Sequence, residues 1–478
     1  MVQSKGKGTF MSPTDSFPEA MTVGKLFNCT RLCGADISLP CSIKTDSRKI
    51  EKGDVFIALK GNRSDGHSFI SDAIKRGAKG VILKDEEMSK FTSFNKDISF
   101  FGVPSPDAAI LEASERYLAG LSSLREIVAI TGSVGKTTTK EAIGKVLERI
   151  YRVHVSRGNY NTLLGCCLTI LAAPRDTEFL VLEMGANAKG EIGEIANKFR
   201  PSSSVITSVE PVHLEGFGDI EGVLGAKLEI VTADCKLLFV NGDSPILNSG
   251  IDKLKHRPSK IISVGTSSSC LYRITDSSLR WDGNHYFRKI TIDSPFGLKT
   301  VESKLWGKQH TLIISLAFAV GCEYGVAPDD IVQGLLFMSL PRGRGAILQS
   351  DEGVLFIDES YNASPVSVKA AIDNLCLIPS RGRKVAVLGG MKELGSYANR
   401  FHDDVLYYAA TAADQVLIHG SEWKDINKNY KNVLCLQDME DIVNHLKAIL
   451  RTGDVVLVKG SRTYEMERIY DWWSLHEL

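Results

Sequence analysis

Short runs of apolar and β-branched residues alternate along the chain with segments whose apolar residues recur at helical spacing. Strands that alternate with helices build mostly parallel sheets covered by helices, so the pattern predicts an α/β protein. The strand-like runs are 53–59, 78–83, 127–131, 180–182, 204–209, 237–240, 354–357, 384–388, 415–418, 433–436 and 455–458. Helical stretches are predicted at 311–323 and 329–338.

Breaks in this pattern divide the chain into an extension and three domains. Residues 1–20 are rich in Ser, Gly, Lys and Pro and are predicted to be disordered. Residues 21–118 form a first α/β domain, and 119–340 form a central one built around a phosphate loop. The sequence Pro341-Arg-Gly-Arg-Gly345 suits a hinge, so a third, Rossmann-like α/β domain is predicted over 341–478.

Composition and charge narrow the possible partners. Lys+Arg and Asp+Glu both number 57, so no long-range field favours nucleic acid or an anionic membrane. No apolar run approaches the about 18 residues that span a bilayer, and the first twenty residues lack the apolar stretch of a signal peptide. Ten cysteines at irregular spacings favour reduced, buried thiols over a metal site. A cytoplasmic monomer is the expected state.

The segment from Ile127 to Thr139 joins an apolar strand to a glycine turn, a lysine and three threonines. Glycines in such a loop let backbone amides face a polyphosphate, the lysine reaches its outer oxygens, and the first threonine is placed for Mg²⁺. The general loop begins with a glycine five residues before Gly135, where this chain has Ile130. The flanking strand and amphipathic helix still favour ATP over a chance turn. The predicted ATP-binding residues of the loop are Gly132, Ser133, Val134, Gly135, Lys136, Thr137 and Thr138.

Three further residues are candidates for metal or catalysis. Glu183 ends an apolar strand and could reach a metal beside the phosphate loop, although a solvated charge at a strand end is the alternative. His213 follows another β-branched strand, on the edge of the sheet where ligands bind; a hydrogen-bonded structural histidine is an equal alternative. Lys227 lies on a mostly apolar helix, where residue type alone favours an amphipathic lysine along the surface.

Polar residues also gather around the predicted hinge and the first strand that follows it. Arginine suits bidentate phosphate binding, so an arginine on a hinge could engage the γ-phosphate only when domains close. A plain polar linker is an equal alternative. The residues are Arg342, Arg344, Asp358, Glu359, Tyr361 and Asn362.

Together these motifs resemble those of the Mur ligases, ATP-dependent amide-forming enzymes, over nearly the whole chain. The phosphate loop is similar to that family's even in its missing first glycine. The other matching motifs follow in the family's order: Gly158-Asn-Tyr-Asn161, Glu183-Met-Gly-Ala-Asn187, His213-Leu-Glu-Gly216, Glu359-Ser-Tyr-Asn-Ala363 and Lys459-Gly-Ser-Arg462. Ser360-Tyr-Asn-Ala363 and Gly390-Met-Lys-Glu-Leu-Gly395 are most similar to the member that adds D-alanyl-D-alanine to a UDP-N-acetylmuramoyl-tripeptide.

The resemblance implies roles that residue type only permits. Lys136 and the loop amides would hold the β and γ phosphates, and Mg²⁺ would lie near Thr137, Glu183 and His213. Lys227 matches a lysine that the family carbamylates, which would face a second Mg²⁺. Arg344 would approach the γ-phosphate, and Asp358, Glu359, Tyr361 and Asn362 would line the nucleotide and hinge. The UDP-substrate would be held by Thr45, Asp46, Ser47, Arg48, Asp65, His67, Asn159 and Asn161.

Two segments depart from the family's pattern. Thr162 and Leu163 stand where Gly-Asn-x-Asn usually continues with another Asn and a polar residue, and Gly307-Lys-Gln-His-Thr-Leu-Ile313 lacks the usual adenine-contacting Asn. Among rival functions, a folylpolyglutamate synthase would start near its phosphate loop, and a GTP switch would need an Asn-Lys-x-Asp motif. A nucleotide-binding module without turnover remains a formal alternative. The resemblance thus predicts an ATP- and Mg²⁺-dependent ligase with a UDP-linked tripeptide and D-alanyl-D-alanine as substrates.

Overall fold

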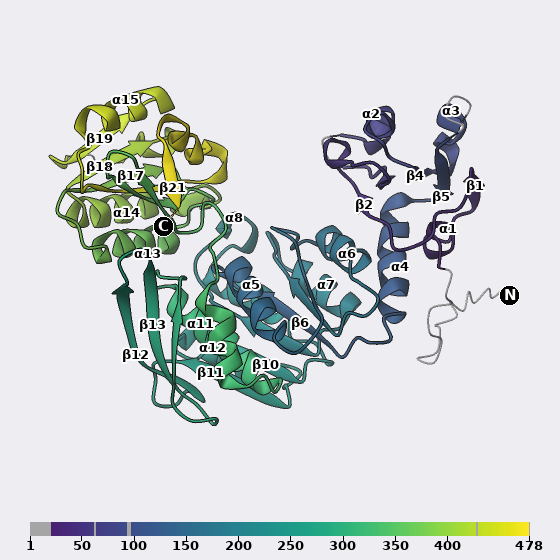
Figure 1. Cartoon of the computed structure of the whole chain (residues 1–478), viewed down its shortest axis with the longest axis horizontal. Coiled ribbons are helices and arrows are strands. Elements are labelled where there is room, and N and C mark those ends of the chain that lie inside the picture. Colours follow the sequence, from purple (N-terminus) through teal and green to yellow (C-terminus); the bar gives the residue numbers. More distant parts are fainter. Residues whose placement is uncertain (1–20, 62–63, 93–96, 427–428, 478) are drawn as a thin grey trace. The chain divides into compact units, whose positions relative to one another are not determined.

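A computed structural model describes residues 21–61, 64–92, 97–426 and 429–477. The predicted disordered extension, 1–20, lies outside the described residues. The chain divides into two compact units, of which the first comprises the sequence through Val128 together with 151–184 and 197–200. The second unit comprises 129–150, 185–196 and 201–478. The described residues form an α/β fold, in which helices alternate with the strands of three sheets, as the alternating pattern predicted (Figure 1).

The first unit contains a five-stranded sheet in the order β1-β5-β4-β3-β2. The four strands β2 to β5 are parallel, and β1 is antiparallel to β5. Apolar side chains of β3, β4 and β5 pack with those of helix α2 (Ile70–Lys75) into one core. The strands are β1 (Arg31–Cys33), β2 (Ile43–Lys44), β3 (Val55–Ile57), β4 (Gly80–Lys84) and β5 (Ser99–Val103).

Helix α4 (Pro106–Ala119) follows this sheet and begins at the cap residue Ser105, whose hydroxyl accepts from the amide of Ala108. The same unit also holds β7 (Val153–Val155) and β8 (Phe179–Glu183), which pair in parallel, and the first residues of β6 (Glu126–Thr131), the strand next to β8 in a nine-stranded sheet. Strand β6 itself crosses from the first unit into the second after Val128. It therefore delivers the chain directly to the phosphate loop.

In the second unit the central sheet has the order β14-β13-β12-β11-β10-β9-β6. Its parallel strands are β9 (Ser203–Ile206), β10 (Leu237–Asn241) and β11 (Lys260–Gly265), and β12 (Tyr272–Trp281) pairs parallel with β11. The antiparallel extension by β13 (Tyr286–Asp293) and β14 (Lys299–Ser303) was not predicted. Residues of β12 are mostly exposed, and Arg288 and Lys289 interrupt the apolar residues of β13, so neither strand has the continuous apolar run on which the prediction relied.

Two helices cover the phosphate-loop side of this sheet. Helix α11 (His310–Glu323) is buried along almost its whole length and packs against α5 (Lys136–Leu147). Gly321 permits this close packing, because a Cβ there would overlap Val146. Helix α12 (Pro328–Leu336) contacts α5 and α11. The predicted helical stretches near residues 311–323 and 329–338 are therefore confirmed.

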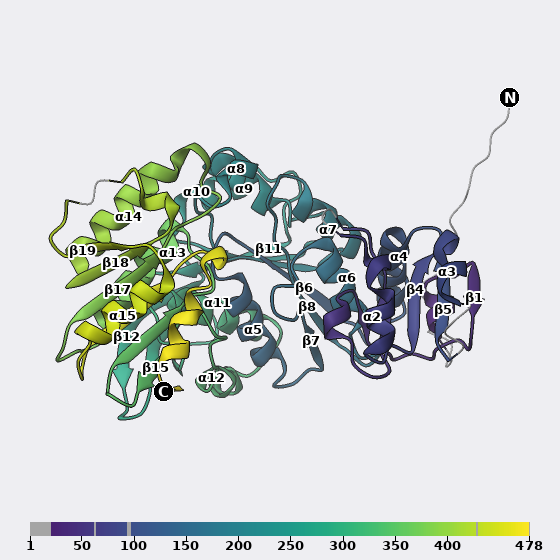
Figure 2. The same ribbon diagram turned by 90° about the horizontal axis from the view of Figure 1, so that it is seen from above.

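The third sheet, also in the second unit, has the order β19-β18-β17-β20-β16-β15-β21. Helices α13 (Pro365–Leu377) and α14 (Ala398–Ala412) pack on one face, and α15 (Met439–Ile449) packs on the other (Figure 2). The predicted strands correspond to β16 (Leu355–Glu359), β17 (Lys384–Gly389), β18 (Gln415–His419), β19 (Val433–Leu436) and β20 (Val455–Lys459). The remaining two, β15 (Ala346–Ser350) and β21 (Leu475–Glu477), are antiparallel neighbours at its edge.

Two expectations from the composition concern membrane-spanning helices and the state of the cysteines. None of the described helices combines the length and the apolar character that a membrane span requires. All ten cysteines are free, as predicted. The expectation that the thiols are buried is wrong for Cys33, Cys376 and Cys435, which are exposed. Cys33 and Cys435 lie on β1 and β19, which are edge strands and so have one open side.

Candidate active site

The phosphate loop joins β6 to α5 through two glycines with positive φ. Gly132 has φ +146° and Gly135, the residue before the helix, has φ +83°. A Cβ at Gly132 would overlap the hydroxyl of Thr207, so only glycine fits there. Helix α5 begins at Lys136, and its first amides have no acceptor within the helix, which makes this end suited to an anion.

The segment after β9 holds the loop in shape. The Ser133 hydroxyl donates to the carbonyl of Glu210 (2.9 Å) and accepts from its amide (2.8 Å). The amide of Val134 donates to the hydroxyl of Ser208 (3.1 Å). Side chains of Thr137 and Thr138 are buried at the start of α5. The loop is thus fixed by its own protein contacts, without relying on a ligand to order it.

Lys136 folds back over this loop. Its ammonium donates to the carbonyl oxygens of Gly132 (2.7 Å) and Ser133 (3.2 Å). The positive charge therefore lies above the turn whose amides begin α5. A phosphate at the helix terminus would lie within the reach of the same side chain.

Glu183 and Asn161 meet in the first unit. Glu183 is buried at the end of β8, and its Oε1 accepts from the side-chain amide of Asn161 (3.0 Å). Asn159 is exposed, and its carbonyl accepts from the amide of Asn161 (2.8 Å). Thr162 caps helix α6 (Leu163–Leu171), since its hydroxyl accepts from Gly165. Thr162, which departs from the family's motif, thus starts helix α6. The side-chain amide of Asn161, which was predicted to bind substrate, orients the carboxylate of Glu183, which was predicted to bind metal.

His213 lies at the start of the short helix α8 (Leu214–Phe217) with φ +51°. Its Nδ1 contacts the carboxylate of Glu393, from the 390–395 segment of the third domain. Burial lowers the pKa of His213; Glu393 opposes this, and the charges of Lys136 and Lys227 add to the lowering. Glu393 also has positive φ (+63°). Sequence alone pointed to the motif around Glu393 but not to this contact.

Lys227 on helix α9 (Ile220–Leu228) is 1% exposed, which contradicts the default of a lysine lying along the surface. Its Nζ lies 5.3 Å from the ring centre of Phe217. Burial, and then the charge of Lys136, lower the pKa of Lys227 to about 7, against the opposing charges of Glu229 and Glu191. At neutral pH a large share of this amine is uncharged, and an uncharged amine is a nucleophile.

The hinge residues are held by the first strand of the third domain. One carboxylate oxygen of Asp358 accepts from the amide of Gly343 (2.8 Å), and the other accepts from the amide and hydroxyl of Ser360. The guanidinium of Arg344 lies 4.0 Å from the ring centre of Tyr361. Arg342 and Asn362 are exposed. The buried Asp358 therefore fixes the hinge backbone, and Arg344 and Tyr361 form its stacked pair.

Glu359 faces Lys459 at the ends of two neighbouring parallel strands, β16 and β20. The Lys459 ammonium is buried, 3.2 Å from Oε2 of Glu359, and also donates to the carbonyl of Asn362 (3.0 Å). The half-buried carboxylate of Glu359 reduces the desolvation cost that the buried ammonium of Lys459 would carry alone. This pair links two of the motifs singled out in the sequence.

The residues predicted for the uridine end lie in turns after β2 and β3. Asp46 accepts from the backbone and guanidinium of Arg48, which lowers the pKa of that carboxyl, while Thr45 and Ser47 flank it. Asp65 accepts from the amide and ring Nδ1 of His67, whose Nε2 accepts from the amide of Lys84. Because β2, β3 and β4 are parallel, these turns follow the carboxyl ends of strands at one edge of the sheet.

Within the described residues, no group of three or more His, Cys, Asp or Glu side chains gathers as a protein-only metal site. Magnesium in nucleotide enzymes is commonly held by one or two carboxylates together with substrate phosphates. The buried carboxylate of Glu183 and the hydroxyl of Thr137 are donors of the type that Mg²⁺ prefers. Each of these groups, taken by itself, therefore has the chemistry that suits a metal arriving with a nucleotide.

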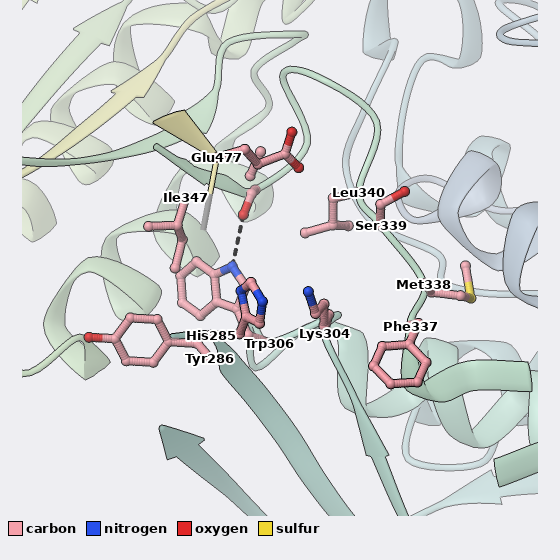
Figure 3. A pocket seen from close by; sticks show the side chains of 12 residues that line it. His285, Tyr286, Lys304, Trp306, Phe337, Met338, Ser339, Leu340, Ile347 and Glu477 are labelled. Atoms are coloured by element: carbon pink, nitrogen blue, oxygen red, sulfur yellow. Dashed lines mark hydrogen bonds between the residues drawn. The ribbon is translucent and has the colours of Figure 1, made fainter. Parts of the chain in front are cut away.

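A cavity of about 270 Å³ lies beside the hinge (Figure 3), and no motif in the sequence predicted it. The indole nitrogen of Trp306 donates to the carbonyl of Gly345 (2.8 Å) at its wall. The side chains of Tyr286, Phe337, Lys304 and Glu477 also line it. The lining thus comes from the start of β13, the segments that follow β14 and α12, the start of β15 and strand β21.

Comparisons with known proteins agree with this arrangement. Three family models match in succession: "Mur ligase family, catalytic domain" over residues 42–116, "Mur ligase middle domain" over 130–321, and "Mur ligase, glutamate ligase domain" over 343–462. The UDP-N-acetylmuramoyl-tripeptide--D-alanyl-D-alanine ligase of Bacillus subtilis (strain 168) is 33% identical, over 89% of this chain and 92% of that protein.

Two crystal structures are similar over almost the full length. One is of MurF from Acinetobacter baumannii, with a TM-score of 0.80 and 27% identity, covering 95% of this chain and 99% of that one. The other is of MurF ligase from Thermotoga maritima in complex with ADP, with a TM-score of 0.75 and 29% identity, covering 90% and 96%.

Proposed function

Because this chain belongs to the Mur ligase family, we propose that it joins D-alanyl-D-alanine to UDP-N-acetylmuramoyl-tripeptide with consumption of ATP. The observation that carries the proposal is the group formed by the phosphate loop, Lys136, His213 and the buried Lys227, whose charges act on one another. The name of the Bacillus subtilis relative and the ADP complex of the Thermotoga maritima structure support the substrates. The product would be a peptidoglycan precursor.

The reaction proceeds in two steps. The terminal carboxylate of the tripeptide attacks the γ-phosphorus of ATP, a new phosphorus–oxygen bond forms, and the bond to ADP breaks. The amine of D-alanyl-D-alanine then attacks the carbonyl carbon of this acyl phosphate. An amide bond forms, inorganic phosphate leaves, and the surplus proton of the amine passes to solvent or substrate. The first step brings two anions together, so it requires positive charge between them.

Lys136 and Arg344 supply that charge from the protein. Lys136 holds the outer phosphates together with Gly132, Ser133, Val134, Gly135, Thr137 and Thr138. Arg344 lies on the hinge, so domain closure brings it toward the γ-phosphate. Asp358, Glu359, Tyr361 and Asn362 keep the hinge and nucleotide region in shape, the first three through the contacts described above. Positioning of the two reactants supplies most of the remaining acceleration.

When bound, Mg²⁺ neutralises charge on the phosphates and on the developing bond. Thr137, Glu183 and His213 are the proposed ligands, directly or through water. Lys227 is proposed to react with CO₂: its uncharged nitrogen forms a bond to the carbon, a proton leaves, and a carbamate with negative charge results. The lowered pKa of Lys227 favours this reaction, because only the uncharged amine carries the needed lone pair. The carbamate would face a second Mg²⁺.

The uridine end of the tripeptide substrate is proposed to bind in the first unit. Thr45, Asp46, Ser47 and Arg48 supply one turn, and Asp65 and His67 supply another. Asn159 and Asn161 are proposed to contact the same substrate nearer the reacting carboxylate, Asn161 through the side of its amide not used by Glu183. We place the reaction in the cytoplasm and expect a monomer.

Purified full-length chain tests the proposal directly. Inorganic phosphate and the UDP-linked pentapeptide are measured with ATP and Mg²⁺ while each peptide substrate is omitted in turn. We expect both products only when UDP-N-acetylmuramoyl-tripeptide and D-alanyl-D-alanine are present together. Phosphate release that continues when either substrate is omitted would refute the ligase proposal. Incubation with other acceptor amines in place of the dipeptide then measures how strictly it is selected.

A further inference from the structure

The turn ahead of α11, residues 307–309, departs from the family's sequence pattern and is closed by a buried histidine. His310 accepts from the amide of Gly307 through Nδ1 (3.1 Å), and burial lowers the pKa of His310 to about 3. The ring is therefore uncharged and engaged with its own turn. The other hydrogen bonds that stabilise this turn come from the third domain.

Asn374, on helix α13, reaches this turn with both ends of its side-chain amide. Its Oδ1 accepts from the amide of Lys308 (2.9 Å), and its Nδ2 donates to Oε1 of Gln309 (2.7 Å). Asn374 is 0% exposed, in a helix whose other buried residues are mainly apolar. A buried amide with both partners supplied is costly to disrupt, since each lost bond leaves an unpaired polar atom.

Gln309 carries the connection onward to the charged pair of the third sheet. Its Nε2 donates to Oε1 of Glu359 (3.4 Å), whose Oε2 faces the ammonium of Lys459 (3.2 Å). The orientation of the Gln309 amide is set at both ends, by a donor in Asn374 and by an acceptor in Glu359. A continuous polar chain therefore runs from α13 through the central-domain turn to the ends of β16 and β20.

The hinge lies directly against this chain. A Cβ built on Gly345 would come within 3.4 Å of Oε1 of Glu359 and 3.7 Å of Cε1 of His310. The amide of Gly345 donates to the carbonyl of Asp358 (2.6 Å), and its carbonyl accepts from Trp306. Gly343 is likewise held by Asp358. Arg344 therefore lies between two glycines whose backbone is held by hydrogen bonds to Asp358.

We propose that Asn374 is a positioning residue, whose amide fixes Gln309 and thereby keeps Glu359 and the 343–345 turn in the arrangement that aims Arg344. The inference rests on the proposed function, because it assigns Arg344 to the γ-phosphate. Loss of the Asn374 amide leaves Gln309 free to rotate away from Glu359. Glu359, which lies beside Gly345, loses its hydrogen bond from Gln309, and the hinge turn no longer aims Arg344.

Asn374→Leu tests this, because leucine is similar in volume but makes no hydrogen bonds. We expect kcat to fall about 10- to 100-fold, as an error of about 1 Å in placing a reacting group does elsewhere. The KM for UDP-N-acetylmuramoyl-tripeptide, whose uridine turns lie in the first unit, should change less than about twofold. Gln309→Leu should reproduce the loss, and the double variant should be no worse than the poorer single one.

Asn432→Leu is the matched control, since the Asn432 amide donates to the carbonyls of Ala410 and Ala413 (both 2.9 Å), outside the chain of contacts. Asn432→Leu should lose about as much thermal stability as Asn374→Leu, and its kcat should stay at the value of the parent. Equal kcat in Asn374→Leu, Gln309→Leu and the control would overturn the inference. Losses that add in the double variant would also overturn it.

Trypsin gives a readout that does not need ligase activity, because Arg342 and Arg344 lie in the hinge itself. We expect cleavage after these arginines to be several-fold faster in Asn374→Leu and Gln309→Leu than in Asn432→Leu. Unchanged cleavage would overturn the inference even if the parent chain makes no amide. An inactive parent with faster hinge cleavage in the variants would instead reject the proposed function and retain the role of Asn374 in holding the hinge.

Discussion

Lys227 shows how burial changes the chemistry of a single residue. Its surroundings hold the pKa of Lys227 at about 7, and the proposed carbamate would form only from the uncharged amine. Lys227→Ala should lower kcat by at least about 100-fold, the scale of losing one group that stabilises transition-state charge. Added short carboxylates should restore part of the activity, which is measured by product formation. Full activity without them would contradict the carbamate.

The lowered pKa of Lys227 also predicts how the stability of the fold changes with pH. The unfolded chain holds the Lys227 proton up to its ordinary pKa of 10.5, while the folded chain releases it near 7. The burial penalty is therefore fully present below pH 7 and disappears as the pH rises toward 10.5. Lys227→Met should be at least as stable as the parent at pH 6, with the difference shrinking at pH 9. Denaturant unfolding at both pH values measures this; the opposite trend would contradict the burial argument.

A substitution of Lys136 should affect catalysis without affecting folding. Its ammonium lies over the phosphate loop, but the loop is also held by Ser133 and Val134. Lys136→Ala should therefore abolish ATP-dependent amide formation and leave the melting temperature within a few degrees of the parent. Thermal unfolding and product formation are measured on the same preparation. Retained turnover would refute the site assignment.

At the scale of elements, the contact between α11 and α5 sets the angle of the helix that begins at the phosphate loop. Gly321 allows it, since a Cβ there would overlap Val146 and come within 2.8 Å of Ile331. Gly321→Ala should cost about 1–3 kcal/mol of unfolding free energy and raise the KM for ATP. Gly225→Ala, in helix α9 with open space around it, is the matched control and should be neutral or slightly stabilising. Equal behaviour of the two variants would contradict this account.

Elements whose signal is local were predictable from sequence. The phosphate loop is one, because its glycines, lysine and helix start all lie within a few residues of each other. Strands β13 and β14 were missed, because their stability comes from pairing with distant residues and not from a long apolar run. The burial of Lys227 and the contact of His213 with Glu393 were also out of reach, since both depend on segments brought together only by the fold.

At the scale of the whole molecule, the contact between the His213 ring and the Glu393 carboxylate joins the central and third domains within the second unit. Glu393 is the charge that opposes the lowering of the His213 pKa. Glu393→Gln should therefore lower that pKa further, because burial, Lys136 and Lys227 then act unopposed. NMR titration of the ring measures it, with His213→Gln identifying the signal. An unchanged or raised pKa would show that the two domains do not make this contact in solution.

The edge of the third sheet has a practical consequence. Strand β21 pairs with β15, the strand that begins at the hinge, and its last described residue, Glu477, also lines the neighbouring cavity. Removing residues 475–478 would uncover a row of unpaired amides and carbonyls on β15, which is a template for association between copies. Such a truncated protein should aggregate at concentrations where the parent stays dispersed.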